Sequence, residues 1–322
     1  MKDTRRTFIK KTSTAASGLL LGGSMLSACT SSSNSKANKV MPDFDFDISL
    51  AQWCFNKALF SGEMDHLDFA KRAKNEFDIS GIEYVTHFFL DKAQNLDYLK
   101  EMKMRADDFG VTSVLIMVDR EGDLASTSKV KLDDSIERHY KWVEAAKFLG
   151  CHSIRVNAQG DGTFEDSKLA AIDGLSRLTE FANDFEVGVI VEPHGGFSGH
   201  GGWLSDVMKQ VNMPGCGTLP DFGNFCLKRD EAYNCLEPYN VYQGTKELMP
   251  YAKGVSAKTF DFDENGNEVN YDYRKLFSII KESGFNGYVG VEYEGKNISP
   301  EEGIRLTKSL LERTKKEINN AG

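Results

Sequence analysis

The fold is decided by the stretch Val187-Gly188-Val189-Ile190-Val191-Glu192-Pro193-His194-Gly195-Gly196. Its first five residues are apolar or small and rich in valine, which is typical of a strand covered on both faces of a parallel sheet. A carboxylate, a proline and two glycines then end the strand and open a pliable loop. Helical spacing follows over Trp203–Val211. The stretch therefore predicts one strand–helix unit with polar groups at the carboxyl end of its strand.

The same unit recurs along the chain, eight times between residues 45 and 318. Eight such units predict an α/β fold with a single closed parallel (β/α)8 TIM barrel, which typically needs about 250 residues. An open doubly wound sheet that binds a dinucleotide needs a glycine-rich first turn, and residues 56–60 have none. The predicted strands are Ile48–Trp53, Gly81–Val85, Thr112–Val118, Ser153–Asn157, Val187–Glu192, Thr218–Asp221, Gly254–Thr259 and Tyr288–Glu292. The predicted helices cover Met64–Phe77, Asn95–Phe109, Leu132–Leu149, Asp166–Phe185, Trp203–Val211, a region ending near Met249, Tyr271–Glu282 and Pro300–Ile318.

The amino terminus has the features of an export signal. Thr4-Arg5-Arg6-Thr7-Phe8-Ile9-Lys10 resembles a twin-arginine signal, and a short apolar stretch follows it. Leu26-Ser27-Ala28-Cys29 resembles a lipobox, in which Cys29 would become the lipidated first residue. The alternative is an ordinary secretory signal with a basic start.

These features divide the chain into three parts. We expect a signal over residues 1–29, a flexible tether over 30–44 and the barrel over 45–318. The protein would then be exported and held on the membrane only by a lipid on Cys29, on the periplasmic side. Self-association is left open by the sequence.

Composition and charge narrow the function further. The chain has 322 residues, is 40% hydrophobic and carries a formal net charge of −9, which opposes binding to nucleic-acid phosphates. None of its six cysteines forms a C-x-x-C pair. We therefore expect no zinc ribbon and no disulfide framework, and we expect several cysteines to be small buried apolar residues.

Polar residues collect where the predicted strands end, which is where a barrel carries its chemistry. Glu192, Asp221 and Glu292 each end an apolar strand of one barrel. Three carboxylates near one axis are costly to bury unless a cation neutralises them. They predict a site for a divalent metal ion that prefers oxygen ligands, such as Mn²⁺, Mg²⁺ or Co²⁺. The alternative is that the three side chains point into solvent.

These strand ends carry a resemblance over about residues 46–316. Val191-Glu192-Pro193-His194, Leu219-Pro220-Asp221-Phe222 and Val291-Glu292-Tyr293-Glu294 resemble the metal-binding strands of the xylose isomerase-like barrel family. That family includes sugar isomerases and epimerases, inosose dehydratases and endonuclease IV. The resemblance implies a small-molecule sugar substrate and a divalent metal, Mn, Mg, Co or Zn.

The sequence departs from the family pattern at two positions. Ser256 stands where the seventh strand usually carries a histidine ligand, and Asn224 stands where some members have another histidine. His194 would be a substitute ligand, because it lies two residues beyond Glu192. Alternatively, the ammonium of Lys258 would lie among the carboxylates in place of the metal.

The remaining strand-end residues are candidates for binding the sugar. Three strand-end residues also have a structural interpretation: Trp53 as barrel floor, Arg155 as an ion-pair partner, and Lys258 as a lysine that reaches solvent. His87 and His200 are loop candidates on the same face. The substrate-binding candidates are Trp53, Glu83, Arg155, Asn157, His194 and Ser256.

We predict an enzyme, a sugar isomerase or epimerase that transfers a proton at the carbon beside a carbonyl. Glu192 and Glu292 would be the acid/base pair, and Lys258 would clamp a substrate oxygen or act as a base. One alternative is a lyase or hydratase acting on keto-sugars or keto-glycosides through the same first step. Another is a carbohydrate-binding lipoprotein without catalysis, which the absent seventh-strand histidine suggests.

Overall fold

The computed structural model describes residues 43–232 and 234–320. Asp43–Gly322 form one compact unit. The predicted signal, the lipidated Cys29 and almost all of the predicted tether lie outside the described residues. Phe44, which we placed at the end of the tether, is buried, and its backbone N–H donates to Asn319 Oδ1 at 2.9 Å. Among the described residues, no helix combines the length and apolarity needed to cross a bilayer.

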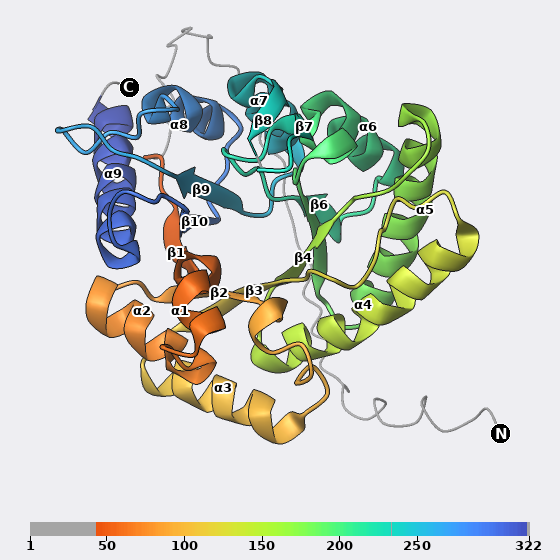
Figure 1. Cartoon of the computed structure of the whole chain (residues 1–322), viewed down its shortest axis with the longest axis horizontal. Helices are drawn as coiled ribbons and strands as arrows, with labels where there is room; N and C mark the ends of the chain where they lie inside the picture. Colours follow the sequence, from red (N-terminus) through yellow and green to blue (C-terminus); the bar gives the residue numbers. More distant parts are fainter. Residues whose placement is uncertain (1–42, 233, 321–322) are drawn as a thin grey trace, which may run out of the picture. The chain divides into compact units, whose positions relative to one another are not determined.

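Eight parallel strands form the central sheet, in the order β6-β5-β4-β3-β2-β1-β10-β9 (Figure 1). Isolated parallel bridges join Thr218 to Ala252 and Asp221 to Ser256, so the two edge strands meet and the sheet closes. This architecture confirms the predicted TIM barrel. The strands are β1 (Asp47–Ala51), β2 (Gly81–Val85), β3 (Thr112–Met117), β4 (Ser153–Asn157), β5 (Gly188–Glu192), β6 (Cys216–Thr218), β9 (Val255–Thr259) and β10 (Tyr288–Tyr293).

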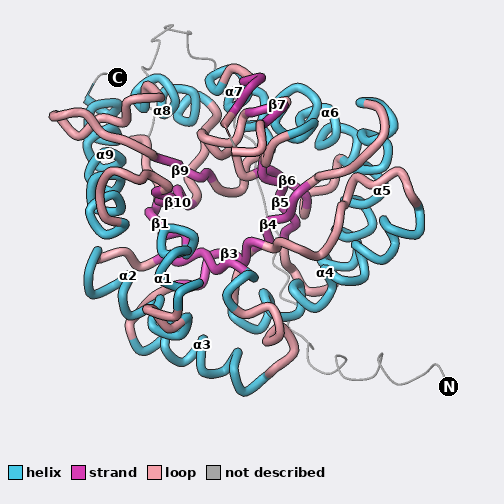
Figure 2. Tube along the Cα trace, viewed as in Figure 1, coloured by secondary structure: helices cyan, strands magenta, loops and turns pink. Residues whose placement is uncertain are grey.

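Helices surround the strands, as Figure 2 shows. Their apolar faces pack against the outside of the sheet and form the main core, which includes Trp142 and Trp203. The helices are α1 (Asn56–Ser61), α2 (Phe69–Phe77), α3 (Leu96–Asp108), α4 (Lys129–Leu149), α5 (Phe164–Asn183), α6 (Gly201–Val211), α7 (Val241–Leu248), α8 (Tyr273–Glu282) and α9 (Pro300–Asn320). The short 3-10 turns η1 (Gln52–Phe55) and η3 (Thr86–Phe88) follow β1 and β2.

The segment after the sixth strand differs from the prediction. We expected a strand over Thr218–Asp221, but β6 ends at Thr218, partly because Pro220 has no N–H to donate to a ladder. Asp221 is instead joined to the sheet by its single bridge to Ser256. The helical region expected before Met249 contains an antiparallel hairpin, β7 (Cys226–Arg229) and β8 (Cys235–Pro238), before the short α7.

A disulfide joins Cys226 to Cys235 across this hairpin. We expected no disulfide framework and named no pair, because a single local crosslink leaves no framework-like spacing in the sequence. Cys54, Cys151 and Cys216 are free and buried, as expected of small apolar residues.

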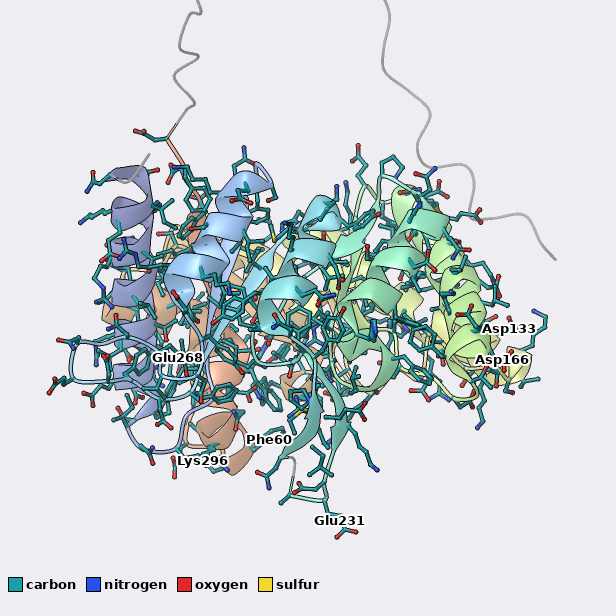
Figure 3. The ribbon with its side chains drawn as sticks, turned by 90° about the horizontal axis from the view of Figure 1, so that it is seen from above. Phe60, Asp133, Asp166, Glu231, Glu268 and Lys296 are labelled. Carbon is teal, nitrogen blue, oxygen red and sulfur yellow. A yellow bond between two sulfur atoms is a disulfide. The ribbon has the colours of Figure 1, made fainter. Side chains whose placement is uncertain are left out.

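The loops that follow the strands gather at one end of the barrel. Figure 3 shows Phe60, Glu231, Glu268 and Lys296 at this end, together with Asp133 and Asp166 near the starts of α4 and α5. The β7–β8 hairpin extends from the same end, and Glu231 lies in its connection. Any site built from the carboxyl ends of the strands opens here.

Candidate active site

The three predicted carboxylates come together at the carboxyl ends of three strands. Glu192 ends β5, Asp221 lies three residues after β6, and Glu292 lies in β10. One oxygen from each carboxylate lies within 4.8 Å of the others, and all three residues are buried. The alternative of three side chains splayed into solvent is therefore wrong.

Ser256 links two of these carboxylates. Its Oγ lies 2.7 Å from Asp221 Oδ2 and 2.8 Å from Glu292 Oε2. A hydroxyl group has one proton to donate, so it satisfies only one of two ionised acceptors. Both hydrogen bonds form only when one of the two carboxyl groups is protonated. When both are ionised, a cation must neutralise the carboxylate oxygen that does not accept from Ser256. Ser256 thus takes the place of a ligand and keeps the two acidic side chains together.

Lys258 supplies a fixed positive charge beside the same pair. Its Nζ lies 3.3 Å from Asp221 Oδ2, 3.6 Å from Glu292 Oε1 and 3.2 Å from Glu294 Oε1. Burial by itself favours the neutral amine, but the surrounding carboxylates, Asp221 first, raise the pKa of Lys258 well above its usual value. The side chain points inward and does not reach solvent, because the residue is only 3% exposed.

Glu192 is held by a second polar array. Asn224 Nδ2 donates to Glu192 Oε1 at 2.8 Å, and Arg155 Nε lies 2.8 Å from Glu192 Oε2 in an ion pair whose angles are not those of a hydrogen bond. Arg155 Nη1 also donates to Asp119 Oδ1 at 2.9 Å, and Asn157 Nδ2 donates to the same oxygen at 2.8 Å. Arg155 and Asn157 therefore position other polar groups as well as facing the site.

The electrostatics of the cluster favour groups that exchange protons near neutral pH. Burial raises the pKa of Glu292 to about 7 and that of Asp221 to about 6, against the opposing attraction of Lys258. Burial also raises the pKa of Glu192, and Arg155 counteracts this rise. Perturbed carboxyl groups of this kind are typical of catalytic acids and bases.

The residues present fit a divalent cation. Three buried carboxylates offer hard oxygen donors within 4.8 Å of one another. Lys258 Nζ lies 3.3 Å from Asp221 Oδ2, so this ammonium already supplies part of the positive charge, as the alternative to a metal required. Glu192, Asp221 and Glu292 would hold the ion. His194 does not belong to this group of converging ligand atoms, so its predicted role as a substitute ligand is not supported.

The structure places the other predicted residues at different depths. Glu83 is buried inside the barrel and accepts from Ser49 Oγ at 2.5 Å. A Cβ on Gly290 would lie 2.6 Å from Glu83 Oε1, so the Glu83 carboxyl group packs against Gly290. Gly290 stands two residues before Glu292 on the same strand, so Glu83 lies deeper in the barrel than the three carboxylates.

Burial, followed by Arg155 and Lys258, lowers the pKa of the partly exposed His194 to about 4. Trp53 is partly exposed in η1, beside His87.

Three residues of the site were not among our predictions. Asp119 follows the third strand directly, so the same strand-end rule that singled out Glu192 would have found it. Asn224 was read only as a missing histidine, although it hydrogen-bonds Glu192. Glu294 stands two residues beyond Glu292 and approaches Lys258, a pairing that the strand alternation alone would suggest.

A family model described as the xylose isomerase-like TIM barrel matches residues 71–314. The chain belongs to this family. Curated relatives match only a short segment: the C-glycoside deglycosidase alpha subunit of Microbacterium trichothecenolyticum is 40% identical over 50 residues, which are 16% of this chain and 14% of that protein.

Solved structures of the xylose isomerase-like fold resemble the whole barrel. A D-tagatose 3-epimerase-like protein aligns with a TM-score of 0.64 and 16% identity, covering 86% of this chain and 99% of that one. The 3-keto-D-glucoside 4-epimerase YcjR of E. coli aligns with a TM-score of 0.62 and 14% identity, over 84% and 100%. The IOLI protein with a bound zinc atom aligns with a TM-score of 0.63 and 15% identity, over 84% and 99%. At these identities the likeness establishes the fold.

Proposed function

We propose that the protein is an enzyme that transfers a proton at the carbon beside the carbonyl of a sugar, as an isomerase or epimerase. The observation that carries this proposal is the pair Glu192 and Glu292, two buried carboxyl groups that meet at the mouth of the barrel with raised pKa values. Family membership and the sugar epimerases among the similar structures support the same chemistry.

Each side chain has a role in this proposal. Glu192 in its ionised form, which the neighbouring Arg155 guanidinium favours, removes the proton from carbon, and the electron pair moves to the carbonyl oxygen. The Lys258 ammonium and the Ser256 hydroxyl stabilise the negative oxygen of the enediolate. Glu292, with a pKa of about 7, is protonated in part near neutral pH and returns a proton to carbon. A metal ion bound by the carboxylates would supply further charge stabilisation.

Glu292→Gln tests this role. We expect it to slow formation of the epimer by ~10²–10⁴-fold, because the amide cannot return a proton, whereas Glu192 can still exchange the proton that it removes with solvent. Epimer formation and solvent exchange would both be followed by NMR in D2O with a panel of keto-hexoses and keto-glycosides. Glu282→Gln, an exposed change on α8, is the matched control and should exchange at the wild-type rate. Epimer formation at the wild-type rate in Glu292→Gln would refute the assignment, and binding without exchange in the wild type would favour a carbohydrate-binding role.

A second candidate is a lyase that acts on keto-glycosides. Two observations favour it: the short match to the C-glycoside deglycosidase alpha subunit, and Ser256 in place of a histidine, with Lys258 beside it. The first step is the same, but the enolate then expels the group on the next carbon, which leaves with a proton from the acid. The NMR experiment separates the two reactions, because only the lyase releases a free alcohol.

A further inference from the structure

Four aromatic rings cluster at the mouth of the barrel, outside the acid/base machinery. Trp53 contacts Phe60, His87 and Phe88 with ring centroids 6.0, 5.6 and 6.1 Å apart. The centroid of Phe60 lies 6.1 Å from that of His87 and 5.1 Å from that of Phe88. These residues come from η1, α1 and η3, the segments that follow the first two strands. We call them the aromatic cluster.

The aromatic cluster is continuous with the candidate active site. His87 Nδ1 lies 3.4 Å from Asp119 Oδ2, and Asp119 accepts a hydrogen bond from Arg155. Arg155 in turn contacts Glu192. A short run of polar contacts therefore connects the aromatic rings to one carboxylate of the acid/base pair. A molecule whose reacting carbon lies at Glu192 and which extends along these contacts would meet the rings.

Core packing accounts for one side of the cluster only, where Trp53 and Phe88 pack against the core inside the barrel. Phe60 is 58% exposed, and Figure 3 shows it at the end of the barrel where the β7–β8 hairpin also emerges. Trp53 is partly exposed, whereas Trp142 and Trp203 are buried at 0% and 1% exposure. Phe60 is thus the exposed member of the cluster, and His87 and Phe88 are partly exposed like Trp53. Aromatic side chains that keep such exposure beside a site are typical of ligand-binding surfaces.

We propose that the aromatic cluster is a subsite for a flat, apolar group attached to the sugar, so that the substrate is an aryl glycoside. The inference rests on the proposed function, which places the sugar ring at the carboxylates. The rings meet at tilted and perpendicular angles, and an aromatic group that packs on their exposed sides gains stacking and edge contacts. A free monosaccharide would leave Phe60 in water.

Two glucosides that differ only in the attached group provide the test. Phenyl and methyl β-D-glucopyranoside would be titrated into the protein by calorimetry and by tryptophan fluorescence, in which Trp53 is the partly exposed reporter. We expect the wild type to bind the phenyl glucoside about tenfold more tightly than the methyl glucoside. Phe60→Ala should reduce this preference to less than threefold and leave the affinity for methyl glucoside unchanged.

Leu169→Ala is the matched control, because Leu169 on α5 is 62% exposed and lies outside the cluster. It should keep the wild-type preference. Equal affinity of the wild type for both glucosides, no detectable binding of either, or equal weakening of both by Phe60→Ala would overturn the inference. Binding of these glucosides requires no turnover, so a phenyl preference without proton exchange would refute only the proposed function. Exchange without a phenyl preference would refute only the aryl subsite.

Discussion

Arg155 joins two acidic side chains that come from different strand ends. It donates to Asp119 Oδ1 at 2.9 Å while its Nε lies 2.8 Å from Glu192 Oε2. Burial disfavours the charged guanidinium, but Asp119 and Glu192 together raise the pKa of Arg155 further above its usual value. The planar fork of arginine makes both contacts at once, which the point charge of a lysine does not.

Arg155→Lys should therefore lower kcat/KM for the keto-sugar that the wild type turns over, by roughly 10–100-fold, while the protein stays folded. Steady-state kinetics and thermal unfolding would be measured side by side. Arg138→Lys is the control, because Arg138 forms an exposed ion pair with Asp134 on α4 and such pairs contribute little. An Arg155→Lys enzyme with wild-type kcat/KM would contradict the positioning role.

At the scale of elements, the β7–β8 hairpin is held by its antiparallel ladder and by a disulfide crosslink. Every residue of β8 is exposed, so this strand buries little apolar surface. The Cys226–Cys235 disulfide closes a short loop and, in the chain-entropy model, contributes roughly 2–3 kcal/mol to the local stability. Disulfides persist in oxidising compartments, which is the setting that the expected export signal predicts.

The double variant Cys226→Ser/Cys235→Ser should loosen the hairpin and leave the barrel intact. Hydrogen exchange read by mass spectrometry should become faster within residues 226–238, and exchange in β4 and β5 should not change. The midpoint of global thermal unfolding should move by only a few degrees, because the hairpin lies outside the closed sheet. Unchanged exchange in the hairpin would show that the crosslink is dispensable for its order.

At the scale of the whole molecule, a carboxyl group inside the barrel makes stability depend on pH. Burial raises the pKa of Glu83 to about 8, and the hydrogen bond from Ser49 opposes this rise. Between pH 4.5 and 8 the folded protein keeps a proton that the unfolded chain releases. Stability is therefore lost as pH rises through this window, by roughly 3 kcal/mol at pH 7 if each pKa unit contributes about 1.4 kcal/mol.

Glu83→Gln should remove this term, since the amide keeps an oxygen for Ser49 and does not titrate. Urea unfolding at pH 5, 6, 7 and 8 should show the wild type losing stability relative to the variant as pH rises. Taking the difference between the two proteins cancels the contributions of Asp221 and Glu292. A constant difference across this range would mean that Glu83 is ionised in the folded state.

The amino-acid sequence by itself determined the barrel and the positions of its three carboxylates. Val- and Ile-rich runs such as Val187–Glu192 have the continuous apolar pattern that is typical of a parallel strand covered on both faces. The carboxyl ends of the strands of a barrel lie at one end, so the residues that end the strands meet there. The family resemblance added the expectation of sugar chemistry. These features are local, so they can be read without knowing which segments meet.

The tertiary structure alone decided how the polar groups pair. Ser256 faces both Asp221 and Glu292 only because the barrel closes between the sixth strand and β9, and Arg155 reaches Asp119 only because β3 and β4 are neighbours. The hairpin with its disulfide and the depth of Glu83 depend on the same long-range packing. Contacts between residues distant in sequence are set by the register of the strands, which the spacing within one segment does not contain.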